Sequence, residues 1–183
     1  MTPAATVTPA SESLAAAFAP PAGEPAWLAE ARLVALGAFR AAGLPTTRLE
    51  DWRYTSLAPL GALTLARPRA DQPGPDLKPL LARAGKLDGP RLVFVNGRYR
   101  PDLTRLAGLP AGATLLSLAD AVREAPGHVR PHLFRLARPA AGALAAASAA
   151  LFEDGAFLLL PAGAAVAPPI RIIHLGGAPG GPV

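Results

Sequence analysis

Two histidines have a spacing that could bind a metal ion. His128 and His132 stand four residues apart, which would place both side chains on one face of a helix. Pro131 lies between them and disfavours a continuous helix, and no carboxylate that could complete the ligand set follows closely. We therefore expect a solvated loop here and no metal site.

The third histidine and the paired carboxylates also suggest structural roles. His174 lies in an apolar run with no Ser, Cys or Asp beside it, which favours a buried or half-buried side chain. Glu50-Asp51 and Glu153-Asp154 are adjacent pairs, and adjacent residues do not face each other on a helix. Each pair is typical of a helix end or a charged turn rather than of a catalytic dyad.

No nucleophile or phosphate-binding loop is indicated. Ser56, Ser117 and Ser148 lack the small-residue elbow that exposes a nucleophile. The segments "GGAPGGPV" and "LDGPRLVF" lack the lysine and the strand-to-helix context of a phosphate-binding loop. The chain has no cysteine, so it offers no thiolate nucleophile or thiolate metal ligand. We predict a chain that is not an enzyme and has no catalytic, cofactor-binding or metal-binding residue.

The positive charge of the chain raises the question of an acidic partner. The formal net charge is +5, and ten basic residues face four acidic ones between Arg83 and Arg138. Sixteen of the 18 basic residues are arginines, which together with heavy Ala, Pro and Gly usage indicates a GC-rich genome. No aromatic residues alternate with these arginines as a stacking platform for single strands would require. Nucleic acid is therefore not the expected partner, although a polyanion-binding module stays the alternative function.

The N-terminal part of the chain is predicted to form two helices. Residues 1–10 are expected to be disordered, and a short helix is expected over 11–18 with Ser11 as its cap. A longer helix is predicted over 25–42, with Pro25 in its first turn and Gly43 as its stop. The apolar residues expected to face the core follow helical spacing: Trp27, Ala31, Val34, Ala35, Ala38, Phe39 and Ala42.

The next stretch, "LPTTRLEDWRYTSLAPL", holds one of two tryptophans and one of two tyrosines. Thr47 and Glu50 stand three apart, as in a capping box, which predicts a short helix that begins near Arg48 and ends before Pro59. The larger apolar side chains would then pack this helix onto the preceding one as a structural clasp: Leu49, Trp52, Tyr54 and Leu57.

The central part of the chain predicts strands. Leu92 to Val95 is a β-branched and aromatic run followed by Asn96-Gly97, the strongest short hairpin signal. A second strand is expected from Thr114, leading into a helix that ends at Pro126. One helical turn is expected over 77–84, and an alanine-rich helix over 144–152 with Gly155 as its terminator.

Two further apolar runs follow, at 156–160 and 170–175. Neither alternates apolar and polar residues, so we expect strands buried on both faces or stacked as successive rungs. A stacked unit needs a neighbour on its open side. The sequence therefore suggests the front part of a longer protein, and an exposed apolar edge at 170–175 that favours self-association. No signal peptide or membrane span is indicated, so a soluble cytoplasmic protein is expected.

Three segments together resemble the N-terminal portion of SufD, in the SufB/SufD family of iron–sulfur cluster assembly proteins. "LPTTRLEDWRYTSLAPL" is similar to the family's "EDW(R/K)YTxL" segment, and "RLVFVNGRYRPDLT" to the strand and turn that follow it. "SAALFEDGAFLLLPAGAAVAPPIRIIHL" is similar to the entry into the family's core. Order and spacing agree over roughly residues 25–175.

The resemblance implies an α+β fold, with an N-terminal helical region followed by the start of a right-handed parallel β-helix. The ranges expected for its parts divide the chain in four. These are a largely disordered N-terminus at 1–24, a helical region at 25–90, a hairpin and helices at 91–152, and the first β-helix rungs at 153–183.

The resemblance also implies a scaffold subunit that acts by association. SufD pairs with its paralogue SufB, and each holds a subunit of the ATPase SufC, in a complex that assembles a transient iron–sulfur cluster while the ATPase uses ATP. The contacts with the SufB-like paralogue and the SufC-like ATPase are expected in a C-terminal part beyond Val183, so no functional residue is carried over onto this sequence. A β-helix carbohydrate-active enzyme stays a third hypothesis, which would need clustered carboxylates on later rungs.

Overall fold

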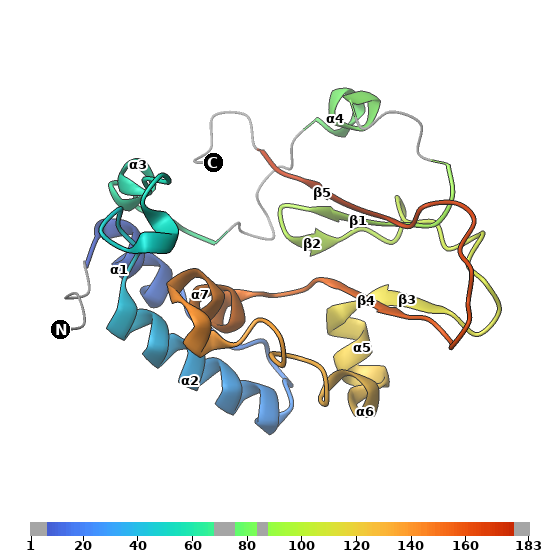
Figure 1. Ribbon diagram of the computed structural model, residues 1–183. Helices are drawn as coiled ribbons and strands as arrows, with labels where there is room; N and C mark the ends of the chain where they lie inside the picture. The colour runs from blue at the N-terminus through green and yellow to red at the C-terminus, as the bar shows by residue number, and fades with distance from the viewer. Residues whose placement is uncertain (1–6, 68–75, 84–87, 178–183) are drawn as a thin grey trace. The chain divides into compact units, whose positions relative to one another are not determined.

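The structure is a computed structural model that describes residues 7–67, 76–83 and 88–177 (Figure 1). The chain divides into two compact units, and neither is continuous in sequence. Unit 1 comprises Met1–Arg67 and Pro131–Phe152, and unit 2 comprises Pro68–Arg130 and Glu153–Val183. Part of the N-terminal disorder prediction (1–6), part of the connecting segment (68–75 and 84–87) and the last six residues lie outside the described residues.

Unit 1 is helical in its described part. Helices α2 and α7, more than 100 residues apart in sequence, pack against each other with α1 beside them, and their buried residues form one core. Its elements are α1 (Pro9–Ala16), α2 (Ala26–Ala42), η1 (Glu50–Trp52), α3 (Ala58–Gly61), η2 (Pro139–Ala141) and α7 (Ala143–Leu151).

The first helix was predicted, but its cap is different. Thr8, not Ser11, is the N-cap of α1, and its side chain accepts a hydrogen bond from the Ser11 backbone. The Ser11 hydroxyl accepts in return from the Thr8 N–H at 2.8 Å, which completes a reciprocal capping box. Pro9 occupies the first turn, where its missing N–H has no intrahelical partner in any case. The prediction placed the start too late because serine can serve the third helical position as well as the cap.

Helix α2 confirms the predicted end at Ala42, with Gly43 at φ 61° as C-cap, but it begins at Ala26, so Pro25 is the N-cap rather than a residue of the first turn. The predicted apolar face is wrong in part, because Val34 is 71% exposed and Ala42 is also exposed. The helix is rotated so that a different stripe is buried: Leu28, Arg32, Ala35, Leu36 and Phe39. The stripe was missed because it contains an arginine.

The core of unit 1 consists largely of small side chains. Phe39 is fully buried, and α7 places four alanines against the other helices: Ala146, Ala147, Ala149 and Ala150. Alanine side chains let helix backbones approach closely, but each buries little apolar area, so large residues such as Phe39 supply much of the apolar contact.

Unit 2 contains two small sheets and three helices in its described part. Strands β2, β1 and β5 form one sheet in that order, and β3 pairs with β4 in the other (Figure 1). The elements are α4 (Leu77–Arg83), β1 (Arg91–Val95), β2 (Arg98–Tyr99), β3 (Thr114–Ser117), α5 (Leu118–Glu124), α6 (Pro126–Val129), β4 (Ala156–Leu159) and β5 (Arg171–Leu175).

The hairpin prediction is confirmed. Strands β1 and β2 are antiparallel, and Asn96 at φ 49° and Gly97 at φ 78° turn the chain between them. Both central residues have positive φ, as the tight hairpin turn requires. The predicted strand from Thr114, the helix that follows it and the helical turn after residue 77 are also present.

The predicted parallel β-helix is wrong. The runs at 156–160 and 170–175 do form strands, but β4 and β5 lie in different sheets. Strand β4 pairs antiparallel with β3, and β5 pairs parallel with β1, where Leu92 lies beside Ile172 and Phe94 beside His174. Within the described residues unit 2 is therefore a small α+β arrangement of short strands. The prediction failed because apolar runs do not specify which earlier strand each one pairs with.

Strand β1 is buried on both faces. Leu92 and Phe94 pack with Leu115 of β3 on one side, and Val93 and Val95 belong to a second cluster on the other. The second cluster includes side chains from β5 and α4: Leu175, Ile173, Leu77 and Leu81. The continuous apolar run of β1 follows from this double burial.

The helix before β4 ends earlier than predicted. Helix α7 ends at Leu151 with Phe152 in extended conformation as its C-cap, and Gly155 does not adopt a positive φ. Gly155 instead accepts a hydrogen bond from the Leu118 N–H at 2.7 Å, next to the Leu118 side chain. Gly155 therefore supplies a backbone acceptor at the start of α5 and does not terminate the helix.

Candidate functional site

The two histidines of the candidate metal site do not share a helix. His128 lies on α6, which ends at Val129, and His132 lies in the turn that follows. The two residues belong to different units, and both are exposed. Within the described ranges no three or more His, Asp or Glu side chains are grouped as a metal site would require.

His174 is exposed, so the prediction of a buried or half-buried histidine is wrong. Its ring stacks on the buried ring of Phe94, with centroids 5.0 Å apart and planes 13° apart. The parallel register places both side chains on one face of the sheet, where the imidazole covers the phenyl ring. The polar ring thus shields an apolar one, a role that residue type alone did not reveal.

The two carboxylates after α7 have separate contacts. Glu153 lies 3.9 Å from Arg98, whereas Asp154 accepts hydrogen bonds from the Ala119 N–H at 2.9 Å and the Gly155 N–H at 2.8 Å. Burial raises the pKa of Asp154 above its usual range, and these two backbone hydrogen bonds oppose the shift. Asp154 thereby satisfies a backbone donor at the start of α5.

Two of the three serines considered as nucleophiles have structural contacts. Ser117 is buried and caps α5, accepting a hydrogen bond from the Asp120 N–H at 3.1 Å. The Ser56 hydroxyl accepts from the Ala58 N–H at 3.3 Å just before α3. Ser148 is exposed on α7.

The segment from Arg48 to Leu57 is a surface turn rather than a clasp. The predicted capping box is absent, since Leu49 is the N-cap of η1 and makes no side-chain cap bond. Tyr54 is 90% exposed, Trp52 is half-buried, and the Arg53 guanidinium lies 5.6 Å from the Tyr54 ring centre. The tyrosine therefore does not pack against the helices.

A cavity of about 340 Å³ lies between the two ends of this turn. Thr46 and Thr47 line it from one end, Ser56 and Leu57 from the other, and Gly61 of α3 lies at the wall. The lining combines hydroxyl groups with apolar surface and contains no charged side chain. Such a lining suits an apolar group with a few hydrogen bonds, but it carries no catalytic constellation.

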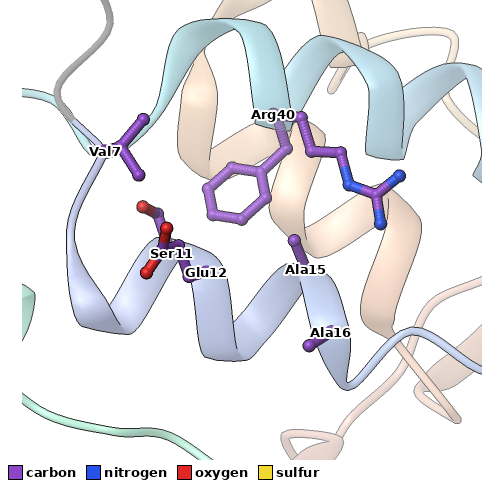
Figure 2. Close-up of a pocket in the computed structure, with 7 residues that line it drawn as sticks. Val7, Ser11, Glu12, Ala15, Ala16 and Arg40 are labelled. Carbon is purple, nitrogen blue, oxygen red and sulfur yellow. The ribbon is translucent and has the colours of Figure 1, made fainter.

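A second cavity of about 340 Å³ lies between α1 and α2 (Figure 2). Val7, Ser11 and Ala15 line it from the α1 side, while Phe39 and Arg40 line it from α2. Figure 2 shows the Arg40 side chain extending along the opening, with Ser11 and Ala15 across from it. The cavity is open and mostly apolar.

The buried Arg32, which the sequence did not single out, connects several segments of unit 1. Its Nε lies 2.6 Å from Glu24 Oε1, and both side chains are at least 95% buried. Its Nη1 donates to the carbonyl oxygens of Ala150 at 3.1 Å and Phe152 at 2.6 Å. A signal was present, because Arg32 occupies the same helical stripe as Leu28 and Leu36.

The arginines of unit 2 are largely engaged with neighbouring groups. Arg100 binds Asp102 through two hydrogen bonds at 2.8 and 2.7 Å, which hold the pKa of Asp102 below its usual range. Further partners are close in each case: Arg98 with Glu153, Arg123 with Asp120, Arg91 with the Leu103 carbonyl, and Arg171 with the Asp88 carbonyl. The carboxylate pairs of Arg98, Arg100 and Arg123 reduce the charge available to a polyanion.

No helix in the described ranges has the length and apolar character needed to cross a membrane.

No curated protein matches the chain. Its sequence does match the family description "SufBD protein N-terminal region" over residues 21–172, which is most of the chain and includes the exposed turn, strands β1 to β4 and the first two residues of β5. The chain therefore belongs to the SufBD family, through that family's N-terminal region, and this membership links it to iron–sulfur cluster assembly by the SUF system.

Proposed function

We propose that the chain is part of a SufD-type scaffold subunit, which acts by binding a SufB-like paralogue and a SufC-like ATPase in the cytoplasm. The observation that carries this proposal is the family match over residues 21–172. The choice of SufD over SufB rests on the segment from Glu50 to Thr55, which follows closely after the N-terminal helix α2.

The strand edges of unit 2 support a role in protein association. Within the described residues β5 pairs only with β1 and β4 only with β3, so each leaves one edge unpaired. Ile172 of β5 lies beside the buried Leu92 of β1, and Leu158 of β4 lies beside the buried Leu115 of β3. Ile172 is nevertheless 48% exposed, and Leu158 is 40% exposed. Apolar side chains beside open edges favour coverage by another protein segment.

Co-purification tests the proposal directly. The protein encoded by the complete gene, with an affinity tag, is expressed together with the paralogue and the ATPase, and the same is done with residues 1–183. We expect the complete protein to retain both partners and residues 1–183 to fail to retain the ATPase. A complete protein that elutes without either partner would contradict the scaffold role.

The alternative of a polyanion-binding module predicts a different result. Affinity for random DNA would fall steeply with salt if several arginines of unit 2 neutralised phosphates. We expect no such binding, because Arg98, Arg100 and Arg123 already pair with carboxylates. Salt-dependent DNA binding by residues 1–183 would favour the alternative.

A further inference from the structure

A short basic segment of unit 1 presents an apolar side chain to solvent. Leu136 is 92% exposed, and Arg135 and Arg138 on either side of it are also exposed. The sequence from Pro131 to Phe152 contains these two arginines and His132 but no carboxylate. No salt bridge in the described part of the chain involves either arginine. Leu136 therefore lies between two cations that lack a carboxylate partner within the described residues.

The segment is held at both ends. Phe134 packs against the core of unit 1, and its ring meets that of Phe152 edge-on at 6.0 Å between centroids. The backbone of Phe134 has a φ of 62°, which a bulky residue rarely adopts and which the surrounding packing must maintain. On the other side, η2 packs against α2 and α7.

Backbone hydrogen bonds order the residues between these two ends. The Arg135 N–H donates to the His132 carbonyl at 3.1 Å, and the Arg138 N–H donates to the Leu136 carbonyl at 3.0 Å. Arg138 Nε also donates to the Arg135 carbonyl at 3.2 Å, which fixes part of its side chain while leaving its charge uncompensated. A pre-ordered loop loses less conformational entropy when it binds a partner.

We propose that residues 132–138 form a docking segment for an acidic peptide of a partner protein, with Leu136 packing against an apolar side chain between the acidic ones. The two arginines match carboxylates in charge and geometry. Arginine is one of the residue types enriched among those that carry the binding energy of protein–protein interfaces, which favours a protein partner here.

Nucleic acid fits the segment less well than an acidic peptide. Two arginines would neutralise few phosphates, whereas nucleic-acid affinity depends on many such contacts. Of the two aromatic rings in the segment, that of Phe134 packs against the core, which leaves the exposed His132 as a single ring where a stacking platform uses several. An exposed leucine would also contribute little on a phosphate backbone.

Fluorescence anisotropy with a labelled peptide of alternating Glu and Leu tests the proposal on residues 1–183. We expect binding at low salt that weakens about tenfold in R135E/R138E and about fivefold in L136S. The matched controls R48E/R105E and L106S change two exposed arginines and an exposed leucine elsewhere, and should bind like the parent chain. A peptide of alternating Glu and Ser should bind more weakly than the leucine peptide, and to the same extent in L136S as in the parent.

Three results would overturn the proposal. The first is no binding of the Glu-Leu peptide by the parent chain. The second is equal loss in the control variants, which would indicate a non-specific charge effect. The third is stronger binding of a labelled single-stranded DNA that R135E/R138E abolishes and L136S leaves intact. Melting curves of each variant verify that the substitutions leave unit 1 folded. Because the probe is a synthetic peptide, the outcome is independent of the proposed SUF partners.

Discussion

The guanidinium of Arg32 lies 3.9 Å above the ring centre of Phe152, a residue 120 positions further along the chain. The same guanidinium pairs with Glu24 and binds the last carbonyl groups of α7. A cation at a helix C-terminus also interacts favourably with the helix dipole. This one side chain therefore connects the loop before α2, helix α2 itself and the end of α7.

Replacing Arg32 by alanine should destabilise the protein strongly. The change leaves the Glu24 carboxylate buried without its cation, which costs about 3 to 5 kcal/mol of unfolding free energy. Arg32→Lys should recover only part of this loss, because an ammonium lacks the planar fork. Urea unfolding followed by circular dichroism gives both values. The exposed control Arg48→Ala should change stability by less than about 0.5 kcal/mol, and a similarly small effect of Arg32→Ala would show that the contacts do not stabilise the fold.

The aromatic residues of the surface turn should differ in their effect on stability. Tyr54→Ala removes a ring that is 90% exposed, so the free energy of unfolding should change by less than about 0.5 kcal/mol. Trp52→Ala should cost more than that but less than the ~3 to 5 kcal/mol of a fully buried ring. Thermal melting of the two variants side by side checks the order. A larger loss for Tyr54→Ala would mean that the ring packs against the protein in solution.

Two glycines should respond to alanine in opposite directions. Gly97 has a φ of 78° in the hairpin turn, so Gly97→Ala strains the backbone and should cost about 1 kcal/mol. Gly37 lies within α2 with open space where a Cβ would be, so Gly37→Ala should stabilise by roughly 0.5 to 1 kcal/mol. Chemical unfolding gives the free energy of unfolding of both variants. Equal effects of Gly97→Ala and Gly37→Ala would contradict the positive φ assigned to Gly97.

The carboxyl group of Asp154 should make stability depend on pH in an unusual direction. Its pKa is raised in the folded protein, mainly by burial, so the folded state binds its proton more tightly than the unfolded state does. Its stabilising contribution is therefore complete below the unfolded pKa and is lost as pH rises through the folded pKa. Asp154→Asn keeps an acceptor for the Ala119 N–H but removes the titration.

The difference in melting temperature between the parent chain and Asp154→Asn should accordingly shift in favour of the variant as pH rises from about 4. Carbon-detected NMR titration of the Asp154 carboxyl group measures the pKa itself. A pKa at or below the ordinary aspartate value would refute the prediction.

The open edge of unit 2 should cause self-association of residues 1–183. Ile172 lies on β5 beside an edge that has no strand partner in the described residues. Ile172→Lys places a charge there and should lower the fraction of oligomer at a given concentration. Analytical ultracentrifugation measures this, with Leu106→Lys as a control for an exposed leucine outside the strands. A parent chain that stays monomeric at high concentration would contradict the prediction.

Local signals in the sequence were sufficient for most elements. Pro25 marks the start of α2, Gly43 marks its end, and Asn96-Gly97 forms the predicted turn. Each of these residues acts through its own backbone angles, which distant segments do not change. The failures concern residues whose role depends on distant segments. Thr47 and Glu50 have capping-box spacing, yet η1 begins only at Glu50, with Leu49 rather than Thr47 as its N-cap.

The candidate site residues also divide into those governed by their neighbours in sequence and those governed by distant segments. The separation of His128 from His132 followed from Pro131, a local effect that the sequence displays. The exposure of His174 did not, since it depends on the register with Phe94 of a strand 80 residues earlier. Arg32 was overlooked because an arginine on an apolar stripe is normally solvated, and only Glu24 and the end of α7 make its burial favourable.

The sequence alone thus determined the family, the positions of most helices and strands, the hairpin and the lack of a thiolate. These depend on residue order, backbone preferences and composition, which act over a few neighbouring positions. The pairing of β4 with β3 and of β5 with β1, the rotation of α2 and the exposure of Tyr54 and Leu136 emerged only in three dimensions. Strand pairing and burial depend on contacts between segments that lie far apart in the chain, and short-range patterns leave several such arrangements equally compatible.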